Sequence, residues 1–288
     1  MKADIAETES PSDATGPRGA TRTWFGSDYA ELVKARLTLL VLLTTAVGYY
    51  LGATSPVSFA GLFHVVLGTA CAAAGAAALN QWWERKSDAL MARTRTRPVP
   101  GGRMRPLEAL LAGTIFSFVG VIYLALMCNA LSAVLAALTI VIYIFAYTPL
   151  KRISTFNTLV GAIPGALPPM VGWGAARGTI DAGAWSLFAV MMLWQLPHFF
   201  AIAWMYREDY SRAGFQMISN DDRTGERSAS QSVFFCMLLL VVAGIPGFVG
   251  ISSQIYIPIE IFLSGLYVAS AMRFLSKRTA PAAPKRKT

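Results

Sequence analysis

The chain has 288 residues, of which 55% are hydrophobic and only 14% are charged, and its net charge is +9 at pH 7. Soluble domains carry about 25% charged residues, so a water-soluble globular protein is excluded. The positive charge does not indicate nucleic-acid binding, because most Lys and Arg lie in loops beside apolar segments. The three cysteines lie in or beside apolar segments without CxxC spacing, which favours packed thiols over disulfides or a zinc site.

The amino-terminal stretch is polar and acidic, with Pro and Ser, and no apolar segment follows a basic start. This pattern is not that of a secretory signal, and the acids argue against an organellar transit peptide. We expect a disordered cytoplasmic tail over 1–28, a membrane domain over 29–276 and a basic cytoplasmic tail over 277–288.

Eight apolar segments follow, each long enough to cross a hydrocarbon core of ~30 Å as a helix. They are expected near 32–53, 58–82, 107–128, 130–148, 157–176, 183–205, 230–250 and 256–275. The second contains a run of small residues, 70–78, which lets helices approach closely and predicts a buried position. The fifth is rich in Gly and Pro, which predicts a broken helix beside a cavity. The predicted fold is an all-α, polytopic transmembrane helix bundle of about eight helices around a central intramembrane cavity.

The basic residues predict the orientation of this bundle. With the amino terminus in the cytoplasm, 24 of the 25 Lys and Arg fall on the cytoplasmic side, and only Arg177 falls opposite. This asymmetry predicts that both termini are cytoplasmic. We expect a bacterial inner-membrane protein whose long, charged loops, near 83–106 and 206–229, carry its function.

A stripe of oxygen-bearing side chains ends the second segment. Asn80, Glu84 and Asp88 are spaced i, i+4, i+8, so they share one face of a helix. Such donors suit Mg²⁺, which binds few carboxylates and completes its shell with water and substrate phosphate. The alternative is a solvated helix end in which the acids pair with Arg85 or Lys86, and the spacing alone does not decide between them.

Arginines directly follow the acidic stripe, at Arg93, Arg95 and Arg97. A metal-bridged diphosphate needs both groups, because carboxylates bind the metal and cations bind the remaining oxygens. A basic membrane anchor would explain some of the arginines but not the acids. Lys151 and Arg152, between the fourth and fifth segments, are placed to reach the same anion.

A second polar cluster lies at the end of the sixth segment. Gln195 and His198 flank Pro197 within an apolar helix, where polar side chains usually line a cavity. Glu208 and Asp209 emerge at the same level as the first acidic stripe, so the two patches could share one diphosphate through metals. The alternative is that these two are ordinary loop acids.

In these residues the chain resembles the UbiA-type intramembrane prenyltransferases. In the detail of its motifs it resembles the branch of that family that farnesylates protoheme IX. The resemblance rests on motifs in family order over about residues 30 to 275: Asn80-x₃-Glu84-x₃-Asp88-x₂-Met91-x-Arg93-Thr94-x₂-Arg97-Pro98, Tyr147-Thr148-x-Leu150-Lys151-Arg152, Gly165-Ala166-x-Pro168-Pro169-x₂-Gly172-Trp173, Trp194-Gln195-x-Pro197-His198-Phe199 and Asp209-Tyr210-x₂-Ala213-Gly214. The chain departs from the family in two respects. It shows eight apolar segments where nine are general, and Met205 stands four residues before Asp209, where the wider family often has an Asp.

The resemblance implies that farnesyl diphosphate and protoheme IX are substrates, that Mg²⁺ assists, and that heme O is the product. It implies metal binding by Asn80, Glu84, Asp88, Glu208 and Asp209; diphosphate binding by Arg93, Arg97, Lys151 and Arg152; and a heme or farnesyl pocket lined by Tyr147, Trp194, Gln195, His198 and Phe199. The catalytic set would be Asn80, Glu84, Asp88, Lys151, His198 and Asp209. Membrane lipid surrounds the protein, and heme A synthase or terminal-oxidase assembly factors are implied as partners.

Three questions remain open at this level. His198 could ligate the heme iron, orient the propionates, assist the addition of water, or simply pack in a cavity. Within the enzyme class, the alternative acceptor is an aromatic precursor of a quinone. A transporter is the alternative from another class, since broken helices and intramembrane polar groups occur there, but no inverted repeat is present and the polar groups gather at one face.

Overall fold

The structure, a computed structural model, describes residues 25–54, 56–253 and 255–277. The two predicted tails therefore lie outside the described residues, except for 25–28 and Lys277, which are helical. Over the described ranges the regular elements are all helices: α1 (Phe25–Leu32), α2 (Ala35–Gly52), α3 (Phe59–Asp88), α4 (Pro106–Met127), α5 (Ala130–Val141), the π-helix η1 (Ile142–Tyr147), α6 (Thr148–Leu150), α7 (Asn157–Ala166), α8 (Pro168–Arg177), α9 (Ala182–Met205), α10 (Arg207–Arg212), α11 (Glu226–Val242), α12 (Ile245–Phe248) and α13 (Tyr256–Lys277).

Eight spans among the described residues are long and apolar enough to cross a membrane, which confirms the predicted number. Three of these spans are composite. The fourth joins α5, η1 and α6; the fifth joins α7 and α8; and the seventh joins α11 and α12. The second span is α3, which continues to Asp88, six residues beyond the apolar segment read from the sequence. The polar residues of the predicted stripe are therefore carried by the same rigid helix that spans the membrane.

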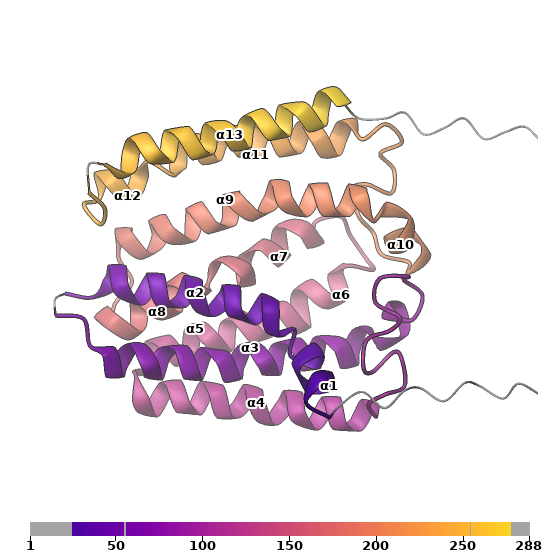
Figure 1. The fold of residues 1–288 in the computed structure, drawn as a ribbon, viewed down its shortest axis with the longest axis horizontal. Helices are drawn as coiled ribbons and strands as arrows, with labels where there is room; N and C mark the ends of the chain where they lie inside the picture. The colour runs from indigo at the N-terminus through magenta and orange to yellow at the C-terminus, as the bar shows by residue number, and fades with distance from the viewer. Residues whose placement is uncertain (1–24, 55, 254, 278–288) are drawn as a thin grey trace, which may run out of the picture.

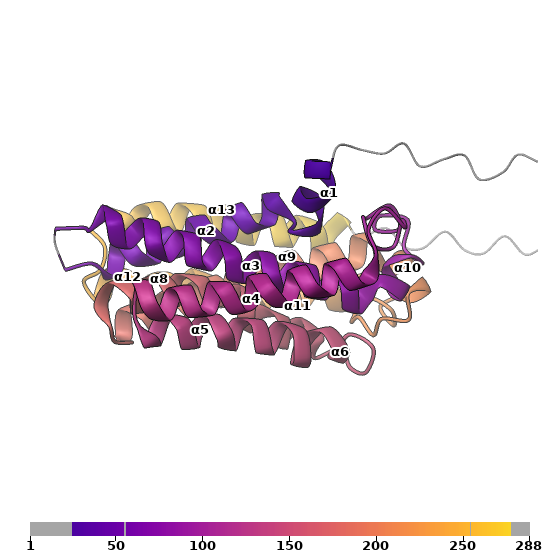
Figure 2. The ribbon, with the colours of Figure 1, turned by 90° about the horizontal axis from the view of Figure 1, so that it is seen from below.

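The spanning helices run side by side along the long axis of the molecule (Figure 1). The segments 89–105 and 206–225, with α10, gather at one end, which we call the loop end. At the opposite end the spans are joined by short connections such as 128–129 and 178–181. The view from below shows a bundle that is wider than it is thick (Figure 2). This asymmetry puts the long charged loops together, as the sequence predicts.

Small residues allow the closest helix contacts. A Cβ added at Gly75 of α3 would lie 2.4 Å from the backbone nitrogen of Ser117 in α4, and one at Gly172 of α8 would lie 1.9 Å from the carbonyl oxygen of Thr45 in α2. Helices in lipid associate through such close packing, because lipid tails offer no hydrophobic driving force between them. The predicted burial of the second span is confirmed. In its apolar stretch of 18 residues 44% are buried, against 22% in the corresponding stretch of α4.

The fifth span is broken, as its Gly and Pro content predicts. α7 ends at Ala166 and α8 begins at Pro168, whose ring nitrogen has no hydrogen to donate to the preceding turn. It is also the most buried of the eight spans, since 67% of its apolar 18-residue stretch is buried. A cavity of about 40 Å³ lies beside the break, lined by Pro168, Val171 and residues of α2, α3 and α5. The interior of the bundle is therefore closely packed around the break.

Candidate functional site

The predicted stripe on α3 is buried at the loop end. Asn80, Glu84 and Asp88 are 1%, 6% and 1% exposed. Three polar side chains at these depths cannot be a solvated helix end, and the ion-pair partners that this alternative required, Arg85 and Lys86, do not bind them. Buried polar groups need partners, and the partners come from other elements.

Each side chain of the stripe accepts a hydrogen bond from a cation. The Lys34 Nζ donates to the Asn80 Oδ1 at 2.8 Å. The Lys151 Nζ donates to the Glu84 Oε1 at 2.7 Å, and the Arg97 Nη1 donates to the Asp88 Oδ2 at 2.8 Å. Lys34 precedes α2, Lys151 follows α6, and Arg97 lies in the loop after α3. The stripe therefore connects three segments at the loop end of the bundle.

Lys34 is the site residue that sequence reasoning missed. It stands between α1 and α2 with φ 52°, the only non-glycine residue with positive φ in the described ranges. Gln81 holds this corner, because its Nε2 donates to the carbonyl oxygens of Glu31 and Leu32 at 3.0 Å. Burial, with the nearby charge of Arg97 adding to it, lowers the pKa of Lys34 to about 7. The sequence signal was a single Lys before an apolar segment, which also fits a membrane anchor.

Lys151 is positioned by the π-helix that precedes it. Its ammonium group lies 4.4 Å from the ring centroid of Tyr147 in η1 and 5.6 Å from that of Phe215. Burial alone would lower the pKa of Lys151, but the Glu84 carboxylate outweighs it and raises the pKa above the usual value. Lys151 is therefore a firmly protonated cation in an aromatic enclosure.

The second acidic patch reaches the first through Asp209 alone. The Asp209 Oδ1 accepts from the backbone N–H of Ala92 at 3.3 Å and pairs with Arg212 at 3.3 Å. Glu208 is exposed. Asp209 therefore contacts the segment that follows the α3 stripe, whereas the structure does not bring Glu208 to it.

The predicted diphosphate-binding cations take different positions. Arg97 and Lys151 bind the stripe directly. Arg93 lies 4.7 Å from the ring centroid of Tyr206, and Arg152 donates to the hydroxyl of Ser87 at 2.6 Å. Ser87 precedes Asp88, so Arg152 is one residue away from the stripe, at the surface.

The residues predicted to line the heme or farnesyl pocket, Tyr147 of η1 and four residues of α9, fall into two groups. Phe199 lines a cavity of about 50 Å³ with Tyr147 at the loop end, and Gln195 is buried and donates to the carbonyl of Ala162 at 2.6 Å. Trp194 and His198 are exposed and stack on each other, with centroids 5.9 Å apart. They lie on a neighbouring stripe of α9, toward α13, whose Tyr267 donates to the carbonyl of Trp194 at 3.0 Å. His198 therefore does not line the interior of the bundle.

The donors of the α3 stripe fit Mg²⁺ by their chemistry. They are an amide oxygen and two carboxylates, and Mg²⁺ is usually held by one or two carboxylates with substrate phosphates rather than by a cage of protein ligands. The described residues contain no group of three His, Cys, Asp or Glu side chains close enough to hold one ion, so Glu84, Asp88, Glu208 and Asp209 do not form one cluster. Asn80, Glu84 and Asp88 are the side chains that would hold the metal, with the remaining positions left to phosphate and water.

Comparison with known proteins identifies the fold and the family. The model of the UbiA prenyltransferase family matches residues 41–287. The chain is 41% identical over 261 residues to a protoheme IX farnesyltransferase of Solibacter usitatus, covering 88% of this chain and 89% of the relative. It is 38% identical to a protein of the same name in Koribacter versatilis, covering 96% and 91%.

Solved structures share the helical arrangement at low sequence identity. A digeranylgeranylglyceryl phosphate synthase superposes with a TM-score of 0.69 at 16% identity, covering 87% of this chain and 88% of that one. A UbiA homolog from Archaeoglobus fulgidus, bound to GPP and Mg²⁺, superposes with a TM-score of 0.66 at 16% identity, covering 89% and 91%. With the family model spanning most of the sequence, the chain is a multi-pass membrane protein that belongs to the UbiA prenyltransferase family.

Proposed function

We propose that this protein transfers the farnesyl group of farnesyl diphosphate to a vinyl group of protoheme IX, with addition of water, and so makes heme O. The observation that carries the proposal is the buried stripe of Asn80, Glu84 and Asp88, in which every side chain is bound to a cation. The names of the relatives at 38–41% identity give the acceptor and the prenyl group.

The ion pairs of the stripe supply both halves of a magnesium diphosphate site. When bound, Mg²⁺ neutralises negative charge on the leaving diphosphate. With Glu84 and Asp88 as metal ligands, Lys151 and Arg97 would exchange these carboxylates for diphosphate oxygens. The exchange leaves no buried charge unpaired, and an unpaired buried charge is costly. Lys34 would follow the same course as Asn80 turns to the metal.

The chemistry then proceeds by cleavage of the carbon–oxygen bond of farnesyl diphosphate. The electron pair leaves with the diphosphate, where the cations stabilise it. The π electrons of the vinyl group attack the farnesyl cation and form the new carbon–carbon bond. Water adds to the resulting cation beside the porphyrin and loses a proton. Tyr147, stacked on Tyr143 with centroids 5.6 Å apart, would shield the first cation from water at the loop end.

We propose that the porphyrin approaches from the side of α9 that faces α13. Trp194 and His198 stack there, beside a cavity of about 470 Å³ lined by Trp194, Ser264 and Tyr267. An exposed imidazole beside an indole suits a porphyrin, which offers both a metal and a flat aromatic face. The loop end would face the cytoplasm of a bacterial cell, because it carries most of the basic residues. Heme A synthase or oxidase assembly factors would receive the product.

The test is a transfer assay in membranes that contain the protein. Labelled farnesyl diphosphate and Mg²⁺ are supplied with either protoheme IX or 4-hydroxybenzoate, and the products are separated. Heme O should form with the first acceptor. Prenylated 4-hydroxybenzoate without heme O would contradict the proposal and favour quinone-precursor chemistry.

A pair of variants tests the metal-binding stripe in the same assay. Asp88→Ala should abolish transfer while the protein still inserts into the membrane, whereas Asp221→Ala, at an exposed loop acid, should leave transfer unchanged. Unchanged turnover in Asp88→Ala would refute the role of the stripe. Removal of Mg²⁺ with a chelator should stop transfer reversibly.

A further inference from the structure

We infer that the bundle carries a binding site for an anionic phospholipid, with one acyl chain in an apolar groove between α3, α4 and the α5–η1 segment and the headgroup phosphate at Arg85 and Lys86. The groove has a volume of about 500 Å³ and is lined almost wholly by apolar side chains. This volume is within the range of about 300–1,000 Å³ that is usual for specific small-molecule sites.

The groove is formed by the divergence of two helices over a third. α4 and α5 are joined by the short connection 128–129 and separate toward the loop end (Figure 2), and α3 contributes Leu79, Trp82 and Trp83 to the lining. The π-helix continues the α5 side of the opening and contributes Ile144 and Phe145. Phe118 and Phe145 are 66% and 65% exposed, so the groove opens sideways, where the membrane lies. An acyl chain is therefore the apolar molecule with direct access to it.

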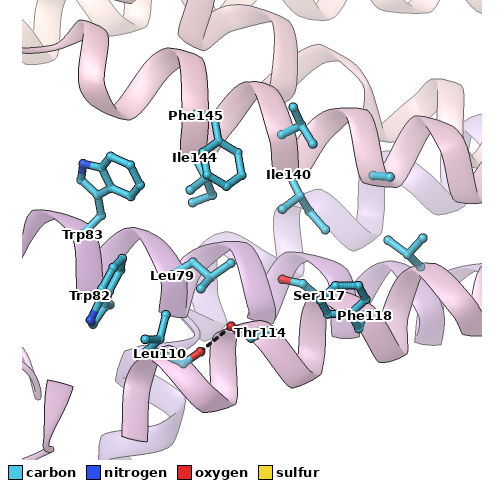
Figure 3. A pocket seen from close by; sticks show the side chains of 13 residues that line it. Leu79, Trp82, Trp83, Leu110, Thr114, Ser117, Phe118, Ile140, Ile144 and Phe145 are labelled. Carbon is cyan, nitrogen blue, oxygen red and sulfur yellow. Dashed lines mark hydrogen bonds between the residues drawn. The ribbon is translucent and has the colours of Figure 1, made fainter. Parts of the chain in front are cut away.

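Aromatic side chains close the groove at its loop end. Trp83 of α3 and Phe145 of η1 make an edge-to-face contact with centroids 6.1 Å apart, and Trp82 packs edge-to-face on Trp83 (Figure 3). Tryptophan is enriched where the hydrocarbon core meets the headgroups, because the ring is apolar and its N–H is polar. The rim therefore marks the depth at which a lipid changes from chain to headgroup.

Two cations stand immediately beyond this rim. Lys86 follows Trp82 and Trp83 on the same stripe of α3 and is exposed, and Arg85 lies 5.2 Å from the ring centroid of Trp82. Neither forms an ion pair in the part of the chain that the structure describes. Basic groups at this level between transmembrane helices attract phosphate headgroups. The charge thus favours an anionic lipid over a neutral one.

The groove is separate from the diphosphate site. Leu79 and Trp83 line the groove, whereas Asn80 and Glu84 face the interior, and neighbouring positions on a helix differ by ~100° in direction. The α3 helix itself stands between them. The cations that bind the interior stripe are likewise different residues from Arg85 and Lys86. The inference therefore does not depend on the proposed reaction.

The test measures lipid binding to the full chain purified and placed in phosphatidylcholine nanodiscs. Spin-labelled phosphatidylglycerol and spin-labelled phosphatidylcholine are added, and the motionally restricted fraction of each is read by electron paramagnetic resonance. We expect the wild type to retain phosphatidylglycerol at least fivefold better than phosphatidylcholine. Equal retention of the two lipids would overturn the inference.

Two adjacent positions on α4 give a matched pair of variants. Thr114 lines the groove (Figure 3), whereas Ile115 is 59% exposed and does not line it. Thr114→Phe should abolish the restricted phosphatidylglycerol signal, and Ile115→Phe should leave it unchanged. The double variant Arg85→Gln/Lys86→Gln should still bind an acyl chain in the groove. Its retention of phosphatidylglycerol relative to phosphatidylcholine should fall toward a ratio of one. Equal signals from the two phenylalanine variants would contradict the groove as the site.

Competition decides between lipid and other occupants, and it needs no variant. Unlabelled phosphatidylglycerol should displace the labelled lipid from the wild type, and farnesyl diphosphate should not. Displacement by farnesyl diphosphate would assign the groove to the prenyl chain instead and overturn the lipid site.

Discussion

At the scale of single residues, Glu84 and Lys151 form the most deeply placed ion pair of the site, with side chains 7% and 10% exposed. Breaking a buried pair from one side typically costs about 3–5 kcal/mol, because the other charge stays buried without a partner. We predict that Glu84→Gln and Lys151→Met each lower the free energy of unfolding by roughly this amount, measured by denaturant titration in detergent.

The double variant Glu84→Gln/Lys151→Met separates stability from function. It leaves no unpaired charge, so its free energy of unfolding should be higher than that of either single variant. Farnesyl transfer should nevertheless remain lost, because the proposed metal ligand and the proposed diphosphate-binding cation are both gone. A double variant in which the two losses simply add would show that the pair is not coupled.

Lys34 carries a second prediction at this scale. A hydrogen bond to a charged group contributes about 1.5–3 kcal/mol, which corresponds to about 10- to 150-fold in rate. We predict that Lys34→Met lowers kcat/KM for farnesyl diphosphate by a factor in this range. Arg36→Met is the control, because Arg36 is exposed two residues away. Equal effects of the two substitutions would show that Lys34 acts only as a basic membrane anchor.

The residues of the site differ in how far the sequence predicts them. The α3 stripe follows from periodicity alone, since i, i+4, i+8 positions of any helix share a face. Its partners do not, because the sequence gives no distance between Lys34 and Asn80, which are 46 residues apart. Tertiary packing brings Lys34 to the stripe and leaves Glu208 exposed.

At the scale of elements, the π-helix η1 sets the rotation of everything that follows it in the fourth span. A π-helix accommodates an extra residue within a helix and occurs often at functional sites. Insertion of one Ala after Ala146, which is exposed, adds a residue beyond the one that η1 already accommodates, and it should rotate Lys151 by ~100° about the axis. Lys151 would then point away from Glu84.

We therefore predict that the insertion after Ala146 abolishes farnesyl transfer and lowers the melting temperature of the protein. Ala146→Leu keeps the length of the segment and should affect neither strongly, since the side chain is exposed. Transfer and thermal unfolding are measured on both proteins. An insertion variant with wild-type transfer would show that the register of η1 is unimportant for Lys151.

The elements also show where a pattern is ambiguous. The break in the fifth span follows from proline chemistry and is visible in the sequence. The division of α9 is not, because Trp194–Gln195 and His198–Phe199 are adjacent pairs and the sequence does not say which stripe faces the interior. Likewise, a π-helix has no composition of its own that distinguishes Ile142–Tyr147 from α-helix.

At the scale of the whole molecule, the number of spans follows from hydrophobicity because lipid admits only helices of sufficient length. The size of the interior cavity does not follow, since it depends on how side chains from several helices interlock. The cavity beside the broken fifth span has a volume of about 40 Å³. Two larger cavities, beside Trp83 and beside Trp194, open toward the side of the bundle. Among the eight spans, α13 is the least buried, since only 17% of its apolar 18-residue stretch is buried, and it therefore contributes least to the packing of the bundle.

The orientation of the bundle gives the last prediction. The basic loop end should face the cytoplasm, and the opposite end, where Arg177 lies, should face outward. In a chain whose Cys71, Cys128 and Cys236 are replaced by Ala, we place single cysteines at two exposed positions, Thr179→Cys in the connection 178–181 and Arg223→Cys at the loop end. A membrane-impermeant maleimide applied to inverted membrane vesicles should label Arg223→Cys at once and Thr179→Cys only after detergent is added. Vesicles of the opposite orientation should reverse the order, and the reversed result in inverted vesicles would place the stripe of Asn80, Glu84 and Asp88 at the outer face and contradict the predicted orientation.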